Sequence, residues 1–284
     1  MRSVVRSRPV APMQKVEPAS GNATASSLQA LGWLTPDWPV SASVRAVCTT
    51  RAGGVSAGRY ESLNLGDHVG DDPLAVAINR QRVQAVIGAQ PVFMQQVHGQ
   101  HVQTLDEGSV EGIQADACIT AERNVACTIM VADCLPVLFA TADGSRVAAA
   151  HAGWRGLAAG VLERTVAMFG SAEPSGIGSS GVETLAWLGP CIGPNAFEVG
   201  DEVKAAFVVA MPASAQCFRP SGSPGKWLAN LPALARQRLA SCGVTRVFGN
   251  DGTDAWCTVH NPSRFFSHRR DGVSGRLAAC IWRV

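Results

Sequence analysis

The stretch that decides how the chain folds is residues 131–156, VADCLPVLFATADGSRVAAAHAGWRG. It contains two apolar runs, VADCLPVLFAT and SRVAAAHA, joined by Asp143-Gly144, a dipeptide typical of a tight turn between adjacent strands. A polar side chain lies near the open end of each run, Cys134 in the first and His151 in the second. The stretch therefore predicts a β-hairpin with a thiol beside an imidazole.

The pairing expected for this hairpin joins residues 137–141 to residues 145–149 around the turn. This register brings Cys134 and His151 to the same end of the sheet. The pair alone does not establish a site, because cysteine is among the most frequently buried residue types and often behaves as a small apolar side chain.

A third side chain, His98, makes the functional interpretation stronger. It follows the strand-like run at residues 91–93 and is itself followed by a glycine. Two imidazoles and one thiolate suit Zn²⁺ in its catalytic form, in which three protein ligands leave one position open. The same three groups also suit copper. We expect His98, Cys134 and His151 to form a metal site.

Composition limits the remaining classes of function. A chain of 284 residues with 46% hydrophobic residues can form one large domain or two small ones. The net charge of +2 gives no argument for a nucleic acid or a membrane surface as partner. No apolar run approaches the length of a membrane span. The nine cysteines are scattered and odd in number, which predicts reduced thiols and a cytoplasmic protein.

Residues 1–30 are predicted to form a disordered extension, because they are rich in Arg, Ser, Ala and Pro and show no periodicity. Farther along, Asp72-Pro73 predicts the start of a helix that ends at Gly88. Residues 115–120 and 125–131 are almost continuously apolar, which predicts strands buried on both faces. Helical periodicity begins after Gly156.

Two loops are candidates for binding an anion. The first, which begins at Arg51 and includes Ser56, has three glycines whose backbone N–H groups can approach a ligand closely. Asn64 and His68 follow it and are expected to face it. In the second, Arg155 lies at a strand-to-helix junction, where exposed N–H groups favour anions. A tight turn and an Arg that only pairs with an acid are the structural alternatives.

Near the C-terminus, two aromatic residues precede a histidine and two arginines in the segment 265–271. They are expected to form a wall for a flat ring that carries an anionic group. A buried aromatic pair beside a solvated turn is the alternative.

Taken together, seven ordered motifs over about residues 32–284 resemble the laccase-like multicopper polyphenol oxidase family, also called YfiH-like, whose members are described as purine nucleoside phosphorylases. The motifs are Arg51-x-Gly-Gly-Val-Ser, Ser62-Leu-Asn-Leu-Gly, Gln96-Val-His98-Gly, Ala132-Asp-Cys134-Leu-Pro, His151-Ala-Gly-Trp-Arg-Gly, Leu188-Gly-Pro-x-Ile-Gly-Pro and Phe265-Phe-Ser-x-Arg-Arg-Asp.

This resemblance implies an α/β fold, a single-domain sandwich of mixed β-sheets flanked by helices, over residues 31–284. It also implies a metal, usually zinc, on His98, Cys134 and His151, and carries Arg51 over as an active-site residue. The implied substrates are adenosine, inosine and S-methyl-5′-thioadenosine with phosphate, and the implied second activity is deamination of adenosine.

The chain departs from the family at two positions. His268 stands where members often have Tyr, and Asn195 where some have Cys. The expected catalytic groups are the three metal ligands and Arg51. The residues expected to contact phosphate and substrate are Arg51, Ser56, Asn64, Arg155 and His268. The purine base is expected to stack on Phe266 or Trp154.

Three other functions stay open from the sequence. Cys134 activated by His151 would suit a metal-free cysteine hydrolase or amidase, a class that includes editing of cell-wall precursors. A copper-dependent polyphenol oxidase is an older description of the family. A zinc-stabilised binding module without catalysis is the third. The chain is expected to be a monomer or a homodimer.

Overall fold

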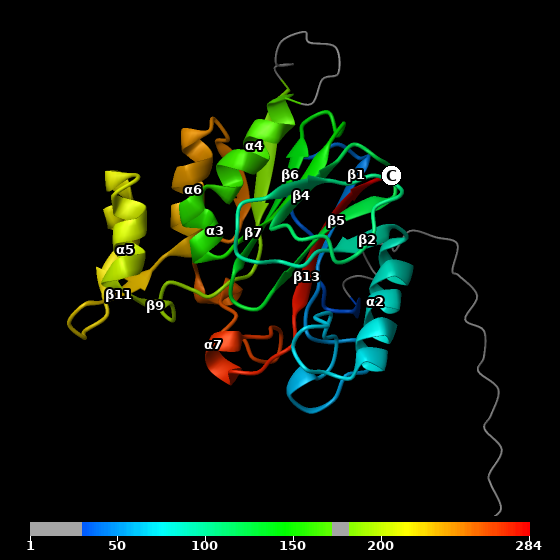
Figure 1. Ribbon diagram of the computed structural model, residues 1–284, viewed down its shortest axis with the longest axis horizontal. Coiled ribbons are helices and arrows are strands. Elements are labelled where there is room, and N and C mark those ends of the chain that lie inside the picture. Colours follow the sequence, from blue (N-terminus) through cyan, green and yellow to red (C-terminus); the bar gives the residue numbers. More distant parts are fainter. Residues whose placement is uncertain (1–29, 172–181) are drawn as a thin grey trace, which may run out of the picture.

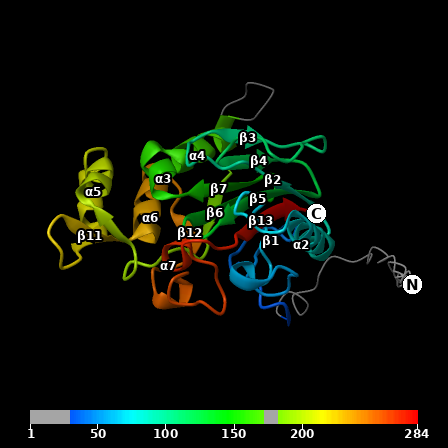
Figure 2. The ribbon, with the colours of Figure 1, turned by 60° about the horizontal axis from the view of Figure 1, so that its bottom comes forward.

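The computed structural model of the chain describes residues 30–171 and 182–284. The extension predicted at residues 1–30 lies outside them, apart from its last residue. The described residues form four layers, in which two large β-sheets pack face to face and helices cover both outer faces (Figures 1 and 2). The predicted sandwich of mixed sheets flanked by helices is therefore confirmed. That residues 31–284 form a single domain stays a prediction.

The first large sheet has four strands in the order β1-β13-β5-β2. Three neighbouring strands are antiparallel, and the edge strand β2 runs parallel to β5. Because β13 lies between β1 and β5, the C-terminal strand belongs to the centre of this sheet. The bounds are β1 Val44–Cys48, β2 Gln90–Phe93, β5 Val125–Val131 and β13 Leu277–Arg283.

The second large sheet has six strands in the order β12-β8-β6-β7-β4-β3. Parallel pairs lie at its two edges, and the antiparallel hairpin β6–β7 lies at its centre. The bounds are β3 Val102–Thr104, β4 Ala117–Thr120, β6 Leu135–Thr141, β7 Val147–Ala152, β8 Thr184–Leu188 and β12 Arg246–Gly249.

A small three-stranded sheet, β10-β11-β9, forms a lobe at one edge of the molecule together with helix α5 (Figure 1). Helices α3, α4 and α6 cover the six-stranded sheet, and α2 covers the four-stranded one. The bounds are β9 Glu198–Gly200, β10 Phe218–Pro220, β11 Lys226–Ala229, α2 Pro73–Ile87, α3 Trp154–Ala159, α4 Val161–Ser171, α5 Asp201–Val208, α6 Leu231–Ser241 and α7 His268–Asp271.

Strand β6 shows why the sequence of the hairpin is apolar without alternation. Val137 and Phe139 pack toward the helices that cover the six-stranded sheet. Leu138 and Ala140 pack into the layer between the two sheets. Both faces of the strand are thus buried, and every residue of β6 is inaccessible or nearly so.

The register of the hairpin differs by one residue from the predicted one. Ala140 pairs with Val147 and Val137 with Ala150. The turn is longer than expected because Ser145 belongs to it, with its backbone N–H donating to Asp143 Oδ1 and its hydroxyl 3.2 Å from the hydroxyl of Thr141. Cys134 and His151 still lie at the same end.

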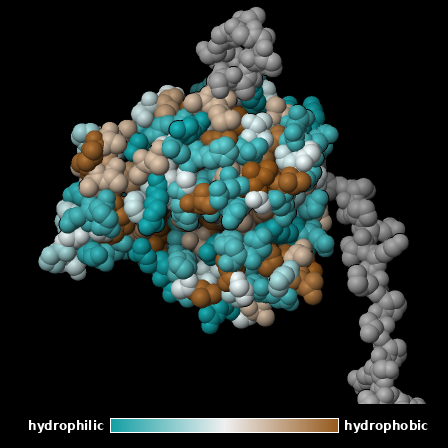
Figure 3. Space-filling view, viewed as in Figure 1, coloured by the Kyte–Doolittle hydropathy of each residue, from teal (hydrophilic) through white to brown (hydrophobic). Residues whose placement is uncertain are grey.

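The other predicted elements are present within a few residues of their expected ends. Helix α2 begins after Asp72, whose side chain accepts a hydrogen bond from the backbone N–H of Leu74, and it ends at Gly88 with φ of 67°. Among the described helices, none is long and apolar enough to cross a membrane. On the face shown in Figure 3, apolar residues form small separate groups among hydrophilic ones.

Candidate metal centre and its pocket

Cys134 and His151 come together at the open end of the central hairpin. Cys134 directly precedes β6, and His151 lies within β7. The turn before Cys134 is held by Asp133, which has a left-handed backbone with φ of 90°. The carboxylate of Asp133 accepts a hydrogen bond from Thr258 Oγ1 and another from the backbone N–H of Arg269, each of 2.6 Å. The C-terminal segment therefore fixes the position of the thiol.

His98 reaches the same point from the loop that follows β2. Its φ of 61° lies in the left-handed region that few residues other than glycine adopt. Two residues earlier, the Gln96 amide pairs with the backbone of Met130 in β5, donating to its oxygen and accepting from its N–H, both at 2.8 Å. This amide clamp ties the His98 loop to the four-stranded sheet.

The three side chains form a compact donor set. The ligand atoms of His98, Cys134 and His151 all lie within 4.8 Å of one another. Cys134 Sγ is 3.8 Å from His98 Nε2, and the two imidazole rings meet edge to face with centroids 4.8 Å apart. Bonds of about 2.0–2.3 Å from zinc to nitrogen and sulfur allow one ion to reach all three atoms after small adjustments. The residues therefore fit a transition metal.

Asp116 organises both histidines and was not predicted from the sequence. Its side chain is fully buried, and its carboxylate accepts hydrogen bonds from the backbone N–H groups of residues 97–99 at 2.7–3.2 Å. His151 Nδ1 lies 2.9 Å from Asp116 Oδ1. An ionised carboxylate only accepts, so Nδ1 carries the hydrogen and Nε2 is left for a metal. The only sign of this role in the sequence was an acidic residue near the start of the apolar run 115–120.

The electrostatics of the group favour a thiolate beside an imidazolium when no metal is bound. Burial alone would raise the pKa of Cys134, but the His151 and His98 imidazoles outweigh it and lower the pKa to about 6. Burial alone would lower the pKa of His151, but the Cys134 thiolate and the Asp116 carboxylate raise it to about 9. Burial also opposes ionisation of Asp116, yet its hydrogen bonds from His151 and the backbone hold its pKa below the ordinary value.

Other cysteines lack this environment. Burial raises the pKa of the Cys127, Cys191 and Cys280 thiols above the ordinary value. Cys118 in β4 and Cys127 in β5 are fully buried, in agreement with the predicted burial of residues 115–120 and 125–131. The lowered thiol pKa of Cys134 is therefore due to the two histidines at the open end of the hairpin.

The glycines after His151 permit the close approach of the loops. A Cβ atom on Gly153 would lie 2.9 Å from Cys134 Sγ and 3.0 Å from His98 Cδ2. A Cβ atom on Gly156 would lie 2.7 Å from the Gly99 carbonyl oxygen. A side chain at either position would push the His98 loop away from the hairpin.

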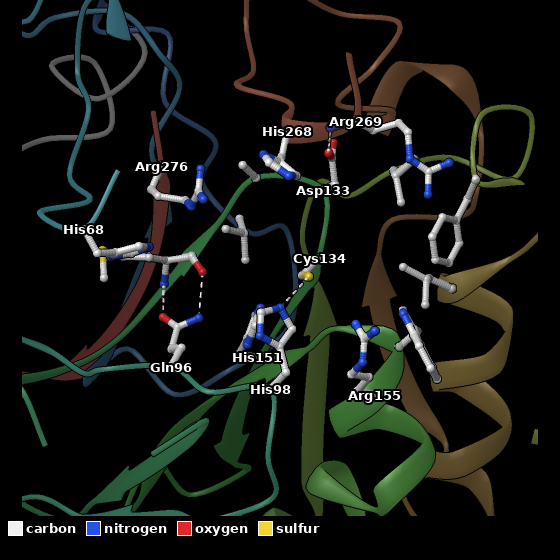
Figure 4. A pocket seen from close by; sticks show the side chains of 17 residues that line it. His68, Gln96, His98, Asp133, Cys134, His151, Arg155, His268, Arg269 and Arg276 are labelled. Carbon is white, nitrogen blue, oxygen red and sulfur yellow. Dashed lines mark hydrogen bonds between the residues drawn. The ribbon is translucent and has the colours of Figure 1, made fainter. Parts of the chain in front are cut away.

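A cavity of about 390 Å³ opens onto the three donor side chains (Figure 4). Besides them, it is lined by cationic, titratable and apolar residues from both large sheets and the C-terminal segment. The cationic and titratable lining residues include Arg155, Arg269, Arg276, His68, His268 and Asp133. The apolar lining residues include Trp154, Ile192, Phe197 and Leu231.

The three arginines of the pocket have no carboxylate partner among the described residues. The Arg155 guanidinium lies over the Trp154 ring, 4.4 Å from its centroid. Arg269 and Arg276 donate to backbone carbonyl oxygens. Burial lowers the pKa of Arg276, as expected for a cation removed from water. The pocket is lined by three arginines and one carboxylate, Asp133, whose charge acts on Arg276 together with that of Cys134. The arginines outnumber these groups, which favours an anionic ligand.

The residues predicted to contact phosphate fall into two groups. Arg155 and His268 line the pocket. Arg51, Ser56 and Asn64 are not among the residues that line this cavity, and their contact with phosphate or substrate stays a prediction. The three arginines of the pocket come from three segments: Arg155 from α3 after β7, Arg269 from α7, and Arg276 from the residue before β13.

The Arg51 guanidinium has partners within the protein. Its Nε donates to the backbone oxygen of Glu61 and its Nη1 to that of Pro262, both at 2.8 Å. Its guanidinium also lies over the ring of Phe266, 4.9 Å from the centroid. Phe266 is fully buried and is not among the residues that line the cavity, so stacking of a base on its ring stays a prediction. Trp154 does line the pocket.

The fold and site define a mixed α/β protein with a His–Cys–His group suited to a transition metal, set at the floor of a cationic pocket. Residues 45–284 match the family described as multi-copper polyphenol oxidoreductase laccase. The chain belongs to this family, which confirms the resemblance found in its motifs.

Two named relatives are similar over most of their length. The chain is 51% identical over 250 residues to purine nucleoside phosphorylase PA4543 of Pseudomonas aeruginosa, covering 88% of this chain and 98% of that protein. It is 46% identical over 253 residues to purine nucleoside phosphorylase YfiH of Escherichia coli K12, with the same two coverages.

Solved structures share the fold. Protein NMB0706 of Neisseria meningitidis superposes with a TM-score of 0.79 at 49% identity, covering 88% of this chain and 98% of that one. YlmD of Geobacillus stearothermophilus superposes with a TM-score of 0.80 at 32% identity, covering 88% and 96%.

The first prediction concerns Asp116. In Asp116→Asn the amide offers one acceptor oxygen where the carboxylate offers two, so the backbone of residues 97–99 and His151 lose part of their support. We expect the affinity for zinc to fall about 10- to 100-fold, measured by competition with a chromophoric chelator. Asp37→Asn is the control, because Asp37 is exposed. An unchanged affinity in a folded Asp116→Asn protein would contradict the assignment.

The second prediction concerns the Cys134 thiol after removal of metal with a chelator. Alkylation by iodoacetamide should be half-maximal near pH 6, because the thiolate is the reactive form and its fraction rises with pH through a pKa of about 6. Half-buried Cys242 is the internal control, since burial raises its pKa above the ordinary 9.0. Timed labelling followed by peptide mass spectrometry gives the alkylation rate of each cysteine separately. If the alkylation rates of Cys134 and Cys242 depended on pH in the same way, the lowered pKa of Cys134 would be refuted.

Proposed function

We propose that the chain is a zinc-dependent purine nucleoside phosphorylase that cleaves adenosine, inosine and S-methyl-5′-thioadenosine with phosphate and also deaminates adenosine. The observation that carries this proposal is the pocket itself, which joins a three-ligand metal group to three arginines without carboxylate partners. Relatives that share up to about half of the sequence are named purine nucleoside phosphorylases, which supports the same class of reaction.

The residues of the pocket supply the two kinds of contact that phosphorolysis needs. Arg155, Arg269 and Arg276 are the proposed phosphate ligands, because guanidinium groups bind phosphate oxygens through paired donors. Their positive charge also stabilises the phosphate while the glycosidic bond breaks. The apolar side chains, Trp154 and Phe197 among them, are proposed to hold the nucleoside and exclude water from the reacting carbon.

His98, Cys134 and His151 are the proposed metal ligands, with zinc as the first candidate and copper as the second. When bound, zinc would supply Lewis-acid charge and lower the pKa of a coordinated water to about 7. Asp116 holds His151 in the tautomer that presents Nε2. His268 lines the same pocket and is proposed to contact the substrate, where other members often have Tyr.

Arg51, Ser56 and Asn64 are proposed to act indirectly. They hold the framework that presents Arg276, since Asn64 Oδ1 accepts a hydrogen bond from the Arg276 backbone N–H at 2.8 Å. We further propose a cytoplasmic location and a monomer or homodimer. Every cysteine is free, which agrees with a reducing compartment.

A second candidate function is favoured by one observation. Asp116 orients His151, and His151 contributes to the lowered pKa of Cys134. Cysteine hydrolases and amidases use the same arrangement, in which a carboxylate orients a histidine and the histidine activates a cysteine nucleophile. That reaction would proceed without metal. Stoichiometric zinc in protein purified without added metal, lost together with activity in Cys134→Ala, would exclude it.

The third prediction tests the proposed reaction. The protein is incubated with adenosine, with and without phosphate, and adenine and inosine are separated by chromatography. We expect adenine only when phosphate is present, accompanied by ribose 1-phosphate, and inosine in both incubations. Chelation or Cys134→Ala should remove both activities, whereas Cys242→Ala, outside the pocket, should keep them.

Adenine formed equally well without phosphate would indicate a hydrolase and contradict phosphorolysis. Inosine alone would reduce the proposal to a deaminase. Full activity after chelation, with zinc shown to be absent, would favour the metal-free alternative.

A further inference from the structure

The loop that carries His68 is held rigidly by a buried polar network. Asp71 Oδ2 accepts hydrogen bonds from Ser56 Oγ at 2.6 Å and from Asn64 Nδ2 at 2.9 Å. Asn79, on helix α2, donates to Ser56 Oγ and to the backbone oxygen of Asn64. Ser56, Asn64 and Asn79 are buried, so this network defines the position of the loop between residues 64 and 71.

The same loop is packed directly against Arg276. Asn64 Oδ1 accepts from the Arg276 backbone N–H, and a Cβ atom on Gly66 would lie 2.7 Å from Arg276 Cγ. Tyr60 donates from its hydroxyl to the backbone oxygen of Val69 at 2.6 Å and closes the far end of the loop. His68, at the tip, lines the pocket on the same side of Cys134 as Arg276 (Figure 4).

A carboxylate lies beside the His68 imidazole, and both side chains are more than half exposed. Nδ1 of His68 lies 3.4 Å from Asp67 Oδ1, and Asp67 Oδ2 lies 3.2 Å from Arg80 Nη2. Arg80 is fixed in turn by Glu111 at 2.6 Å and by the backbone oxygen of Leu65. Among the described residues, Nε2 of His68 has no hydrogen-bond partner, so it is available to a ligand in the pocket.

Four histidines line the pocket, and their surroundings differ. His98 and His151 belong to the metal group. His268 is the first residue of α7 and has no carboxylate partner among the described residues. His68 alone combines a carboxylate at one ring nitrogen with an unpartnered second nitrogen outside the metal group. This is the arrangement of a proton donor or acceptor oriented by an acid.

We propose that His68 is the general acid of phosphorolysis and that Asp67 positions it; this inference rests on the proposed function. A purine leaves a ribose readily only as the neutral base, which requires a proton on a ring nitrogen. Protonated His68 donates from Nε2 to that nitrogen. The bond between C1′ and N9 breaks, its electron pair passes to the base, and a phosphate oxygen forms the new bond to C1′. The hydrogen phosphate loses its own proton on becoming the ester of C1′, and that proton returns to His68 through solvent.

The test compares two leaving groups in the metal-loaded, full-length protein. Adenosine needs protonation, whereas a purine nucleoside methylated at N7 already carries the positive charge and leaves as a neutral base. In His68→Gln we expect kcat for adenosine to fall about 100-fold or more, with KM changed by less than about threefold and a loss below about fivefold for the methylated nucleoside.

Two further variants complete the experiment. Added imidazole should restore activity of His68→Ala on adenosine by about tenfold, because the small acid can enter the space left by the ring. His101→Gln is the matched control, since His101 is exposed and lies outside the pocket lining, and it should retain activity on both substrates.

A kcat for adenosine within about threefold of the unsubstituted protein would overturn the role of His68, because a general acid contributes more than that. So would an equal loss on both nucleosides without rescue by imidazole, which would indicate a structural role. Where the methylated nucleoside is not a substrate of the unsubstituted protein, the imidazole rescue decides alone. Absence of phosphate-dependent cleavage in the unsubstituted protein would instead overturn the proposed function, and this inference with it.

Discussion

The buried carboxylate of Asp116 is the interaction on which the site depends. It accepts three backbone hydrogen bonds from the His98 loop and one bond from His151, so a single charge positions two ligands that come from different sheets. A buried charge is costly unless it is fully hydrogen-bonded. The same four bonds that satisfy Asp116 therefore force the two imidazoles to converge, and they leave the Nε2 atom of His151 directed at Cys134.

The layered fold explains why the pocket lies where it does. The His98 loop leaves the four-stranded sheet, while Cys134 and His151 belong to the central hairpin of the six-stranded sheet. The His–Cys–His group thus lies at one end of the interface between the sheets, where both sets of loops meet. The segment around α7 closes the site from a third direction through Asp133, which binds the backbone N–H of Arg269. Cations from three separate segments can then surround one anion.

Much of the fold and of the site could be predicted from the sequence. The other features depend on residues that are distant in the sequence and meet only in the folded protein. The hairpin, the α2 caps and the convergence of His98, Cys134 and His151 could be predicted, because they depend on local patterns and on residue chemistry. Asp116 could not, since an acid in an apolar run gives no sign of which donors it will meet. Arg51 shows the same dependence: a glycine-rich loop with an arginine is typical of anion sites, but nothing in the sequence indicated that its guanidinium would also donate to the backbone oxygens of Glu61 and Pro262.

The central claim is that one metal ion binds two imidazole nitrogens and one thiolate sulfur. X-ray absorption spectroscopy on zinc-loaded protein tests it most directly. The structure predicts nitrogen scatterers at about 2.0–2.1 Å and a single sulfur scatterer at about 2.3 Å, the latter lost in Cys134→Ser. A zinc spectrum without sulfur, or one unchanged by that substitution, would contradict the claim.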